Sequence, residues 1–291
     1  MSAIETAVLL EHELDRLFTA SEAAWPEGAR ASNREIPVGR PLFRLSFMPW
    51  RARRRPAPSA PPAGPDAAAR ILERECLWRA DGIAATPNSF PVARRHLLLW
   101  ETELRREPSP GLLELLASLA RERPALLGFV NSIGAAATIP RAHAQLLEEP
   151  GSLALDTLPV VWEEGPGCEV GFPGPEAAVF VAALRGDPAR VAAAAVRLLA
   201  LRRDPAFNLV ARRETLYVFF RRAERVPEAY PLPIGALELS GCFIFEDEES
   251  FLAMTGPRCL AALAGACHPP GPGAAEARSE ERRVGKECRS R

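Results

Sequence analysis

The stretch Asn131-Ser-Ile-Gly-Ala-Ala-Ala-Thr-Ile-Pro-Arg-Ala-His-Ala-Gln145 combines small residues with an alternation of polar side chains. Its small residues, from Gly134 to Ala137, allow a ligand or another backbone to approach closely. The alternation that follows places Arg141, His143 and Gln145 on one face of a strand, because successive side chains in a strand point to opposite faces. The stretch therefore predicts one site in which three polar side chains meet.

Strands and a capped helix are predicted before this stretch. The run Ala125 to Val130 is typical of a buried strand, as is His96-Leu-Leu-Leu-Trp100 after the turn residues Asn88-Ser-Phe-Pro91. Between these runs, Ser109-Pro110 supplies an N-cap and a first-turn proline, which predicts a helix. The leucine spacing over residues 1–20 predicts an amphipathic helix at the start of the chain.

Further strands and helices are predicted on both sides of this region. The strands are expected at Pro41 to Trp50, Ala177 to Ala183, Phe207 to Val210, Thr215 to Phe220 and Gly235 to Glu246, and the helices from Asp187-Pro188 to Arg203 and over Phe251 to Ala266. Strands joined by helices that cover one face predict an α+β fold with antiparallel sheets rather than a doubly wound sheet.

The chain divides into two halves by this pattern. Residues 1–150 form the first half, which contains a proline-rich linker at 51–66 and the strand with His143, and residues 151–268 form the second. The low-complexity end, 269–291, carries the only lysine of the chain, Lys286, and its last residues resemble translated read-through. We predict that this end is disordered and exclude it from the fold.

Composition excludes several classes of function. The chain has 291 residues, with 36 Lys and Arg against 37 Asp and Glu, so its formal net charge of −1 offers no field to recruit nucleic acid or an anionic membrane. Six cysteines without a C-x-x-C pair predict reduced thiols and no zinc ribbon. The sequence shows no signal peptide, no apolar run of membrane-spanning length and no glycine-rich dinucleotide or P-loop motif. These observations predict a cytoplasmic protein without nucleic-acid or membrane partners.

Several blocks resemble the histidine-triad superfamily, in the branch of galactose-1-phosphate uridylyltransferase, diadenosine tetraphosphate phosphorylase and GDP-L-galactose phosphorylase. Asn88 through Leu99 is similar to the asparagine-proline strand of that branch, and Asn131 through Gln145 is similar to its Asn-Ser-x-Gly-Ala and Pro-His-x-His-x-Gln motifs. In the second half, the blocks at Phe207-Asn-Leu209, Arg222 and Gly235 to Gly241 look like those of GDP-hexose phosphorylase-like bacterial members. The resemblance implies two histidine-triad-like halves and spans about residues 41–265.

The resemblance also implies a reaction and its residues. His143 would be the nucleophile that forms a nucleotidyl-histidine on a nucleotide-sugar, such as a GDP-hexose, or a dinucleoside polyphosphate, and inorganic phosphate would discharge it. Gln145 would donate a hydrogen bond as charge develops. The substrate phosphates would be held by Asn131, Ser132, the backbone at Gly134, Arg141, and Arg222 or its neighbour Arg221. No cofactor is implied.

One position departs from the family pattern. Arg141 stands where family members carry a histidine that also serves metal binding in the uridylyltransferase branch, so no metal site is expected. Arg141 could add a phosphate donor, or it could mark a catalytically inactive nucleotide-binding or interaction protein on the same scaffold. A nucleotide hydrolase is a further alternative, because hydrolysis and phosphorolysis differ only in whether water or inorganic phosphate reaches the nucleotidyl group. Many relatives pair as homodimers, and no motif here decides the oligomeric state.

Overall fold

The computed structural model describes residues 3–38, 42–54, 66–148, 153–165, 167–174, 179, 181–202 and 204–268. Its centre is a ten-stranded antiparallel sheet in the order β3-β4-β5-β7-β6-β11-β12-β10-β9-β8. The strands are β3 (Trp78–Ala80), β4 (Ile83–Pro87), β5 (His96–Glu101), β6 (Leu126–Asn131), β7 (His143–Glu148), β8 (Val160–Glu164), β9 (Cys168–Pro173), β10 (Val181–Gly186), β11 (Phe207–Arg212) and β12 (Thr215–Phe220).

The two halves of this sheet have the same strand order. Five strands run β3-β4-β5-β7-β6 and five run β8-β9-β10-β12-β11, and the halves join where β6 pairs with β11, with Asn131 opposite Asn208. In each half a helix connects the third and fourth strands along the chain: α3 (Pro110–Glu122) and α4 (Pro188–Ala200). Each helix has the predicted cap, because Ser109 and Asp187 accept a backbone N–H and proline follows. The expected α+β fold with two similar halves is confirmed.

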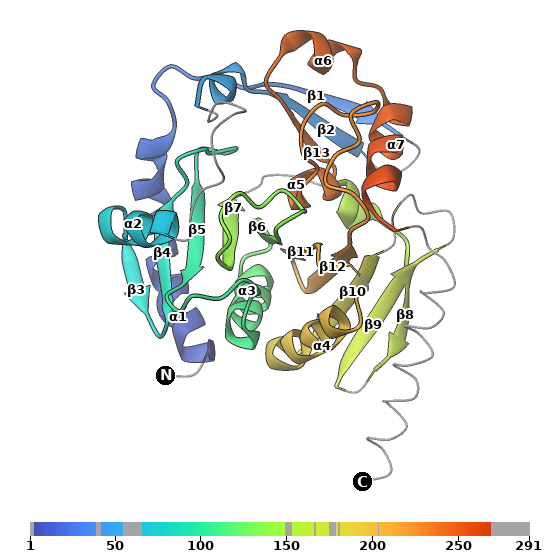
Figure 1. Ribbon diagram of the computed structural model, residues 1–291. Helices are drawn as coiled ribbons and strands as arrows, with labels where there is room; N and C mark the ends of the chain where they lie inside the picture. Colours follow the sequence, from blue (N-terminus) through green and yellow to red (C-terminus); the bar gives the residue numbers. More distant parts are fainter. Residues whose placement is uncertain are drawn as a thin grey trace.

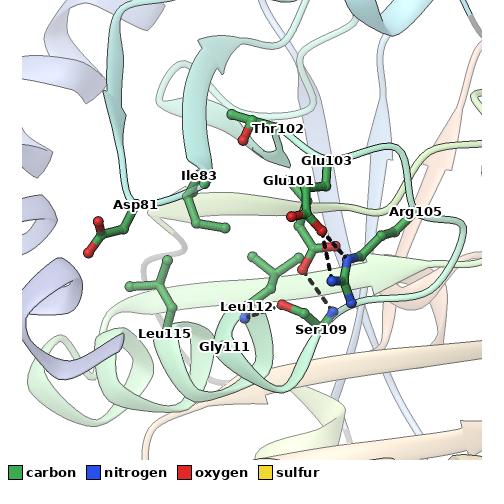
Figure 2. A pocket seen from close by; sticks show the side chains of 11 residues that line it. Asp81, Ile83, Glu101, Thr102, Glu103, Arg105, Ser109, Gly111, Leu112 and Leu115 are labelled. Carbon is green, nitrogen blue, oxygen red and sulfur yellow. Dashed lines mark hydrogen bonds and ion pairs between the residues drawn. The ribbon is translucent and has the colours of Figure 1, made fainter. Parts of the chain in front are cut away.

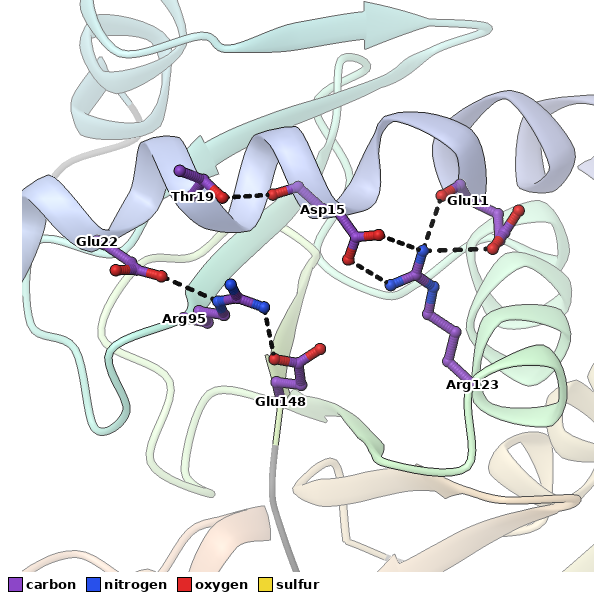
Figure 3. Close-up of polar contacts among 7 residues, drawn as sticks. All are labelled: Glu11, Asp15, Thr19, Glu22, Arg95, Arg123 and Glu148. Carbon is purple, nitrogen blue, oxygen red and sulfur yellow. Dashed lines mark hydrogen bonds and ion pairs between the residues drawn. The ribbon is translucent and has the colours of Figure 1, made fainter.

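Helices α1 (Ala3–Ser21), α3 and α4 cover one face of the large sheet (Figure 1). The leucine stripe of α1 includes Leu10, Leu14 and Leu17, all fully buried in this core. The end of α3 is tied to α1 by Arg123, which pairs with Asp15 and Glu11 (Figure 3). No helix within the described ranges is long and apolar enough to span a bilayer.

The opposite face corrects the expectation that one sheet face alone is covered by helices. A three-stranded sheet of β1 (Ser32–Pro37), β2 (Leu42–Phe47) and β13 (Cys242–Phe245) packs there with α5 (Ala236–Leu239), α6 (Glu248–Ala253) and α7 (Gly256–Ala266) (Figure 1). In this small sheet β13 runs parallel to β2, so it is mixed rather than antiparallel. N- and C-terminal segments thus share one layer.

One predicted strand was wrong. The strand expected over residues 235–246 is the short helix α5 followed by β13, because the buried Glu238 carboxylate accepts the Gly235 N–H and favours a turn there. The strand expected at residues 177–183 matches β10 from Val181 onward, and most of its expected first residues lie outside the described ones. The short helices η1 (Glu22–Ala24), η2 (Pro49–Arg54) and η3 (Ala154–Thr157) were not predicted.

A helix that the sequence did not predict follows the proline-rich segment. Most of the expected linker at 51–66, and the whole of the expected disordered end at 269–291, lie outside the described residues. Helix α2 (Asp66–Arg74) begins where the linker was expected to end, and it packs Ala68 and Leu72 against Leu98 and Trp100 of β5. This small cluster lies on the sheet face that carries His143.

Candidate active site

His143 is the first residue of β7 and lies in a row of side chains across the large sheet. It pairs with Trp100 of β5, and the register of β6 and β7, continued by one residue, places Asn131 on its other side. Asn208 of β11 lies opposite Asn131 and extends the row into the second half. Because neighbours in register share a face, these side chains meet on the face opposite α3 and α4.

The His143 ring is held in one tautomer. Its Nδ1 lies 2.8 Å from the carbonyl oxygen of Arg141, which can only accept, so Nδ1 carries the proton. Nε2 is then unprotonated, and within the described residues no group hydrogen-bonds to it. Burial of the ring, which is 7% exposed, lowers the pKa of His143, and the Arg141 carbonyl opposes that shift. The ring is therefore neutral at pH 7, the state that a nitrogen nucleophile requires.

The indole ring of Trp100 lies against the imidazole ring of His143. Its ring stacks on His143 with centroids 4.6 Å apart and an interplanar angle of 30°. The side chain is fully buried, and its indole N–H donates to the Thr86 hydroxyl at 2.9 Å. Helix α2 packs in the same cluster as Trp100. These contacts leave the indole a single orientation against the imidazole.

Gln145 lies two residues after His143 and its amide is oriented by His96. The backbone N–H of Val92 donates to His96 Nδ1, so Nε2 of His96 carries the proton and donates to Gln145 Oε1 at 2.9 Å. Asn88 Nδ2 lies 3.0 Å from the same ring nitrogen and donates to Gln145 Oε1 at 3.4 Å. Burial lowers the pKa of His96 to about 3, so this ring stays neutral. The amide nitrogen of Gln145 is left without a partner among the described residues.

Asn131 is oriented in the same way from the second half. Its Oδ1 accepts from Asn208 Nδ2 at 2.7 Å and from the backbone N–H of Ala236 at 2.9 Å. Asn208 is itself held by Arg221, whose guanidinium donates to Asn208 Oδ1 and to the Ile234 carbonyl. Among the described residues no group hydrogen-bonds to the amide nitrogen of Asn131, which leaves this donor for another partner.

The loop between β6 and β7 supplies backbone groups. Gly134 and Ala136 adopt left-handed conformations, with φ of 78° and 74°. The Ala136 N–H donates to the Glu224 carboxylate at 2.9 Å. The Ser132 hydroxyl donates to the Phe207 carbonyl at 2.8 Å and accepts the Phe207 N–H at 2.7 Å. The Ser132 hydroxyl hydrogen is therefore used within the fold, whereas Gly134 is exposed.

The three expected arginines lie in different environments. Arg141 is 8% exposed, and its guanidinium donates to the carbonyls of Glu101 and Thr102, so it fastens the end of β5 to the start of β7. Arg221 is 1% exposed, and its guanidinium bonds to carbonyl oxygens of Ala223, Ile234 and Ala266 as well as to Asn208. Arg222 is exposed, and no described contact joins its side chain to His143.

Two cavities lie near these strands. A cleft of about 330 Å³ opens on the α3 face, where Glu101 accepts the Ser109 N–H (Figure 2). A cavity of about 970 Å³ lies between the small sheet and the end of β7, on the His143 face, since Leu147 lines it. At its rim Arg95 pairs with Glu22 and Glu148 (Figure 3).

Metal ligands do not gather in the described part of the chain. No group of three or more His, Cys, Asp or Glu side chains there is arranged to hold an ion. Cys76, which starts a short stretch before β3, bonds its thiol to the Trp78 carbonyl instead.

The described strands of the second half carry no histidine at the position that corresponds to His143. Strand β12 occupies the place of β7 in the repeated strand order, and its residues on this face are Thr215, Tyr217 and Phe219. The row of polar side chains therefore centres on one histidine, with Asn208 and Arg221 as the contribution of the second half.

Comparison with solved structures identifies the fold. Yeast Ap4A phosphorylase Apa2 in complex with AMP matches with a TM-score of 0.66 at 15% identity, over 88% of this chain and 98% of that chain. The same enzyme in complex with Ap4A matches with a TM-score of 0.64 at 18% identity, over 89% and 97%. The sequence itself matches no protein-family model and no curated protein. The fold implied by the histidine-triad resemblance is thus confirmed.

Sequence reasoning did not recognise three members of this site. Trp100 and His96 are part of a run typical of a buried strand, without a predicted contact to His143 or Gln145, and Asn208 is one residue of the Phe207–Leu209 block. Their link to His143 depends on strand register and on the pairing of β6 with β11, which no local pattern shows. The one local pattern that could have indicated the site is the polar residue Asn208 within an otherwise apolar strand sequence.

Proposed function

We propose that this chain is a nucleotidyltransferase of the phosphorylase type, acting through a nucleotidyl-histidine on His143. The observation that carries the proposal is the state of the His143 ring: neutral, buried, with Nδ1 fixed on the Arg141 carbonyl and Nε2 unbound. Such a ring can attack the α-phosphorus of a nucleotide without losing a proton first.

Two oriented amides support the same chemistry. The oxygens of Gln145 and Asn131 are occupied by protein donors, so their NH₂ groups remain for the phosphoryl oxygens beside His143. Donors held in place before the reaction stabilise charge that develops in the transition state without reorganising. Gly134, exposed in the adjoining loop, would let the phosphate chain approach the backbone.

Arg141 does not weaken the proposal. The group that fixes the His143 tautomer is the main-chain carbonyl of residue 141, which any side chain at that position preserves. The guanidinium instead secures the carbonyls of Glu101 and Thr102. We therefore assign Arg141 to positioning the strand that carries His143.

A dinucleoside polyphosphate is the substrate class that we favour over a nucleotide-sugar. Two solved structures that match over most of both chains, with TM-scores of 0.66 and 0.64, are of a phosphorylase whose name specifies Ap4A. That argument is an analogy of fold.

The test is a substrate panel with a defined acceptor. Full-length protein is incubated with Ap4A, GDP-hexoses and UDP-hexoses, with and without inorganic phosphate, and products are separated by chromatography. We expect turnover of one class that depends on phosphate and releases a nucleoside diphosphate. His143→Ala should abolish it, while the exposed His12→Ala serves as the matched control and should keep full activity. Nucleotide binding without turnover across the panel would instead support the binding-protein alternative, and phosphate-independent release of a monophosphate the hydrolase.

A further inference from the structure

Among the described residues, no carboxylate forms an ion pair or a hydrogen bond with His143 that would balance a positive ring. Two influences act on its pKa, burial and the Arg141 carbonyl, and no carboxylate is among them. His96, on the same sheet face, is neutral because burial lowers its pKa to about 3. The extended surface in contact with the imidazole is the indole face of Trp100, at 4.6 Å between centroids.

The reaction under Proposed function, on which this inference rests, makes the ring positive. The lone pair of His143 Nε2 forms the N–P bond while the bond from phosphorus to the leaving oxygen breaks, and that oxygen departs with the electron pair. Nδ1 keeps the proton that it donates to Arg141, so the imidazole becomes a cation in a buried site. When phosphate attacks, the N–P pair returns to Nε2 and the ring is neutral again.

We propose that Trp100 stabilises this transient cation through the face of its indole. An aromatic face attracts a cation within about 6 Å of its centroid, tryptophan more strongly than tyrosine or phenylalanine, and more so where water is excluded. Trp100 meets each condition: its separation and 30° tilt from His143 present the face, and the side chain is fully buried.

The surroundings of Trp100 keep that face in place. The Thr86 hydroxyl holds the indole N–H, and Ala68 and Leu72 of helix α2 pack in the same cluster. The hydrogen bond satisfies the buried indole N–H and fixes the indole, and the stacking at 30° keeps its face on the imidazole. We therefore assign Trp100 a role in the chemical step as well as in packing.

The test uses fluorinated tryptophan, which weakens the electrostatic attraction of the face and nearly preserves its shape. Protein is produced with tryptophan, 5-fluorotryptophan or a difluorotryptophan at all five tryptophan positions. Trp100→Phe protein, labelled in the same way, is the matched control for the other four. The rate of label formation on His143 is measured in single-turnover reactions with Ap4A, and the pKa of His143 is measured by NMR without substrate.

We expect both quantities to fall stepwise with fluorination in the wild-type background and to stay constant in the Trp100→Phe background. The labelling rate of Trp100→Phe itself should be about 3- to 30-fold below wild type, the range that a desolvated cation–π contact supplies. The inference would be overturned if the labelling rate and the pKa of His143 did not change with fluorination. It would also be overturned if both fell equally in the Trp100→Phe background. If no nucleotide labels the wild type, the proposed function fails, and the NMR series still decides the role of Trp100.

Discussion

Gln145 provides the sharpest test of how the site handles phosphoryl charge. Replacing it with alanine removes the one amide donor that follows His143 on the same strand face. The structure sets the size of the effect, because His96 at 2.9 Å and Asn88 at 3.4 Å hold Oε1 and prevent the amide from turning. A preorganised donor of this kind contributes about 2.7–4 kcal/mol to a transition state, so label formation should slow roughly 10²- to 10³-fold.

The assay is rapid-quench labelling with Ap4A under single-turnover conditions, together with nucleotide affinity measured by calorimetry. Gln145→Ala should bind nucleotide within a few-fold of wild type, because the lost donor acts mainly on the transition state. Gln145→Glu keeps an oxygen for His96 but places a carboxylate beside the phosphates, so it should label more slowly than Gln145→Ala. The exposed Glu122→Ala on α3 is the control. Labelling by Gln145→Ala within about five-fold of wild type would refute this account of the amide.

Three further outcomes follow from the described contacts. Stability should rise with pH between about 3 and 6.5, because His96 is protonated there in the unfolded chain, whereas burial in the fold lowers the pKa of His96 to about 3 and keeps the ring neutral. Moving from pH 7 to 5 should therefore lower the free energy of unfolding, measured by chemical denaturation, by about 2 kcal/mol, and His96→Gln should remove this loss. Arg141→Ala should lower the free energy of unfolding by about 2 kcal/mol, because the buried carbonyls of Glu101 and Thr102 lose their donor, and an unchanged Tm would show that this anchor is dispensable. Asn131→Asp should abolish labelling while keeping the Ala236 contact, whereas normal labelling would remove Asn131 from the phosphate site.

Local patterns predicted most of the individual elements. The caps at Ser109 and Asp187, the strand that leads to Asn131, and the strand with His143 and Gln145 lie where the residues indicated. Arg141, expected on the same strand face, instead precedes this strand, and its guanidinium bonds to the carbonyls of Glu101 and Thr102. Each depends on neighbours within one or two turns of chain, which a sequence displays directly.

The rest depends on contacts between distant segments. The mixed small sheet joins β2 to β13 across the whole chain, and Asn131 takes its orientation from Asn208 and Ala236. Helix α2 begins directly after a proline-rich run, so the local sequence does not show where the helix starts. Its packing against Trp100 joins segments about 30 residues apart and is seen only in the structure. The contacts of Trp100 with His143 and of Arg141 with the end of β5 are therefore known from the structure alone.

The central claim is that His143 carries the nucleotidyl group during turnover, and kinetic competence of the labelled protein tests it most directly. Wild type is labelled with Ap4A, freed of nucleotide, and mixed rapidly with phosphate, while the site is located by mass spectrometry of peptides kept at alkaline pH. We predict one acid-labile nucleoside monophosphate on His143, discharged as nucleoside diphosphate at a rate at least equal to kcat. A label on another residue, or one discharged more slowly than turnover, would contradict the mechanism.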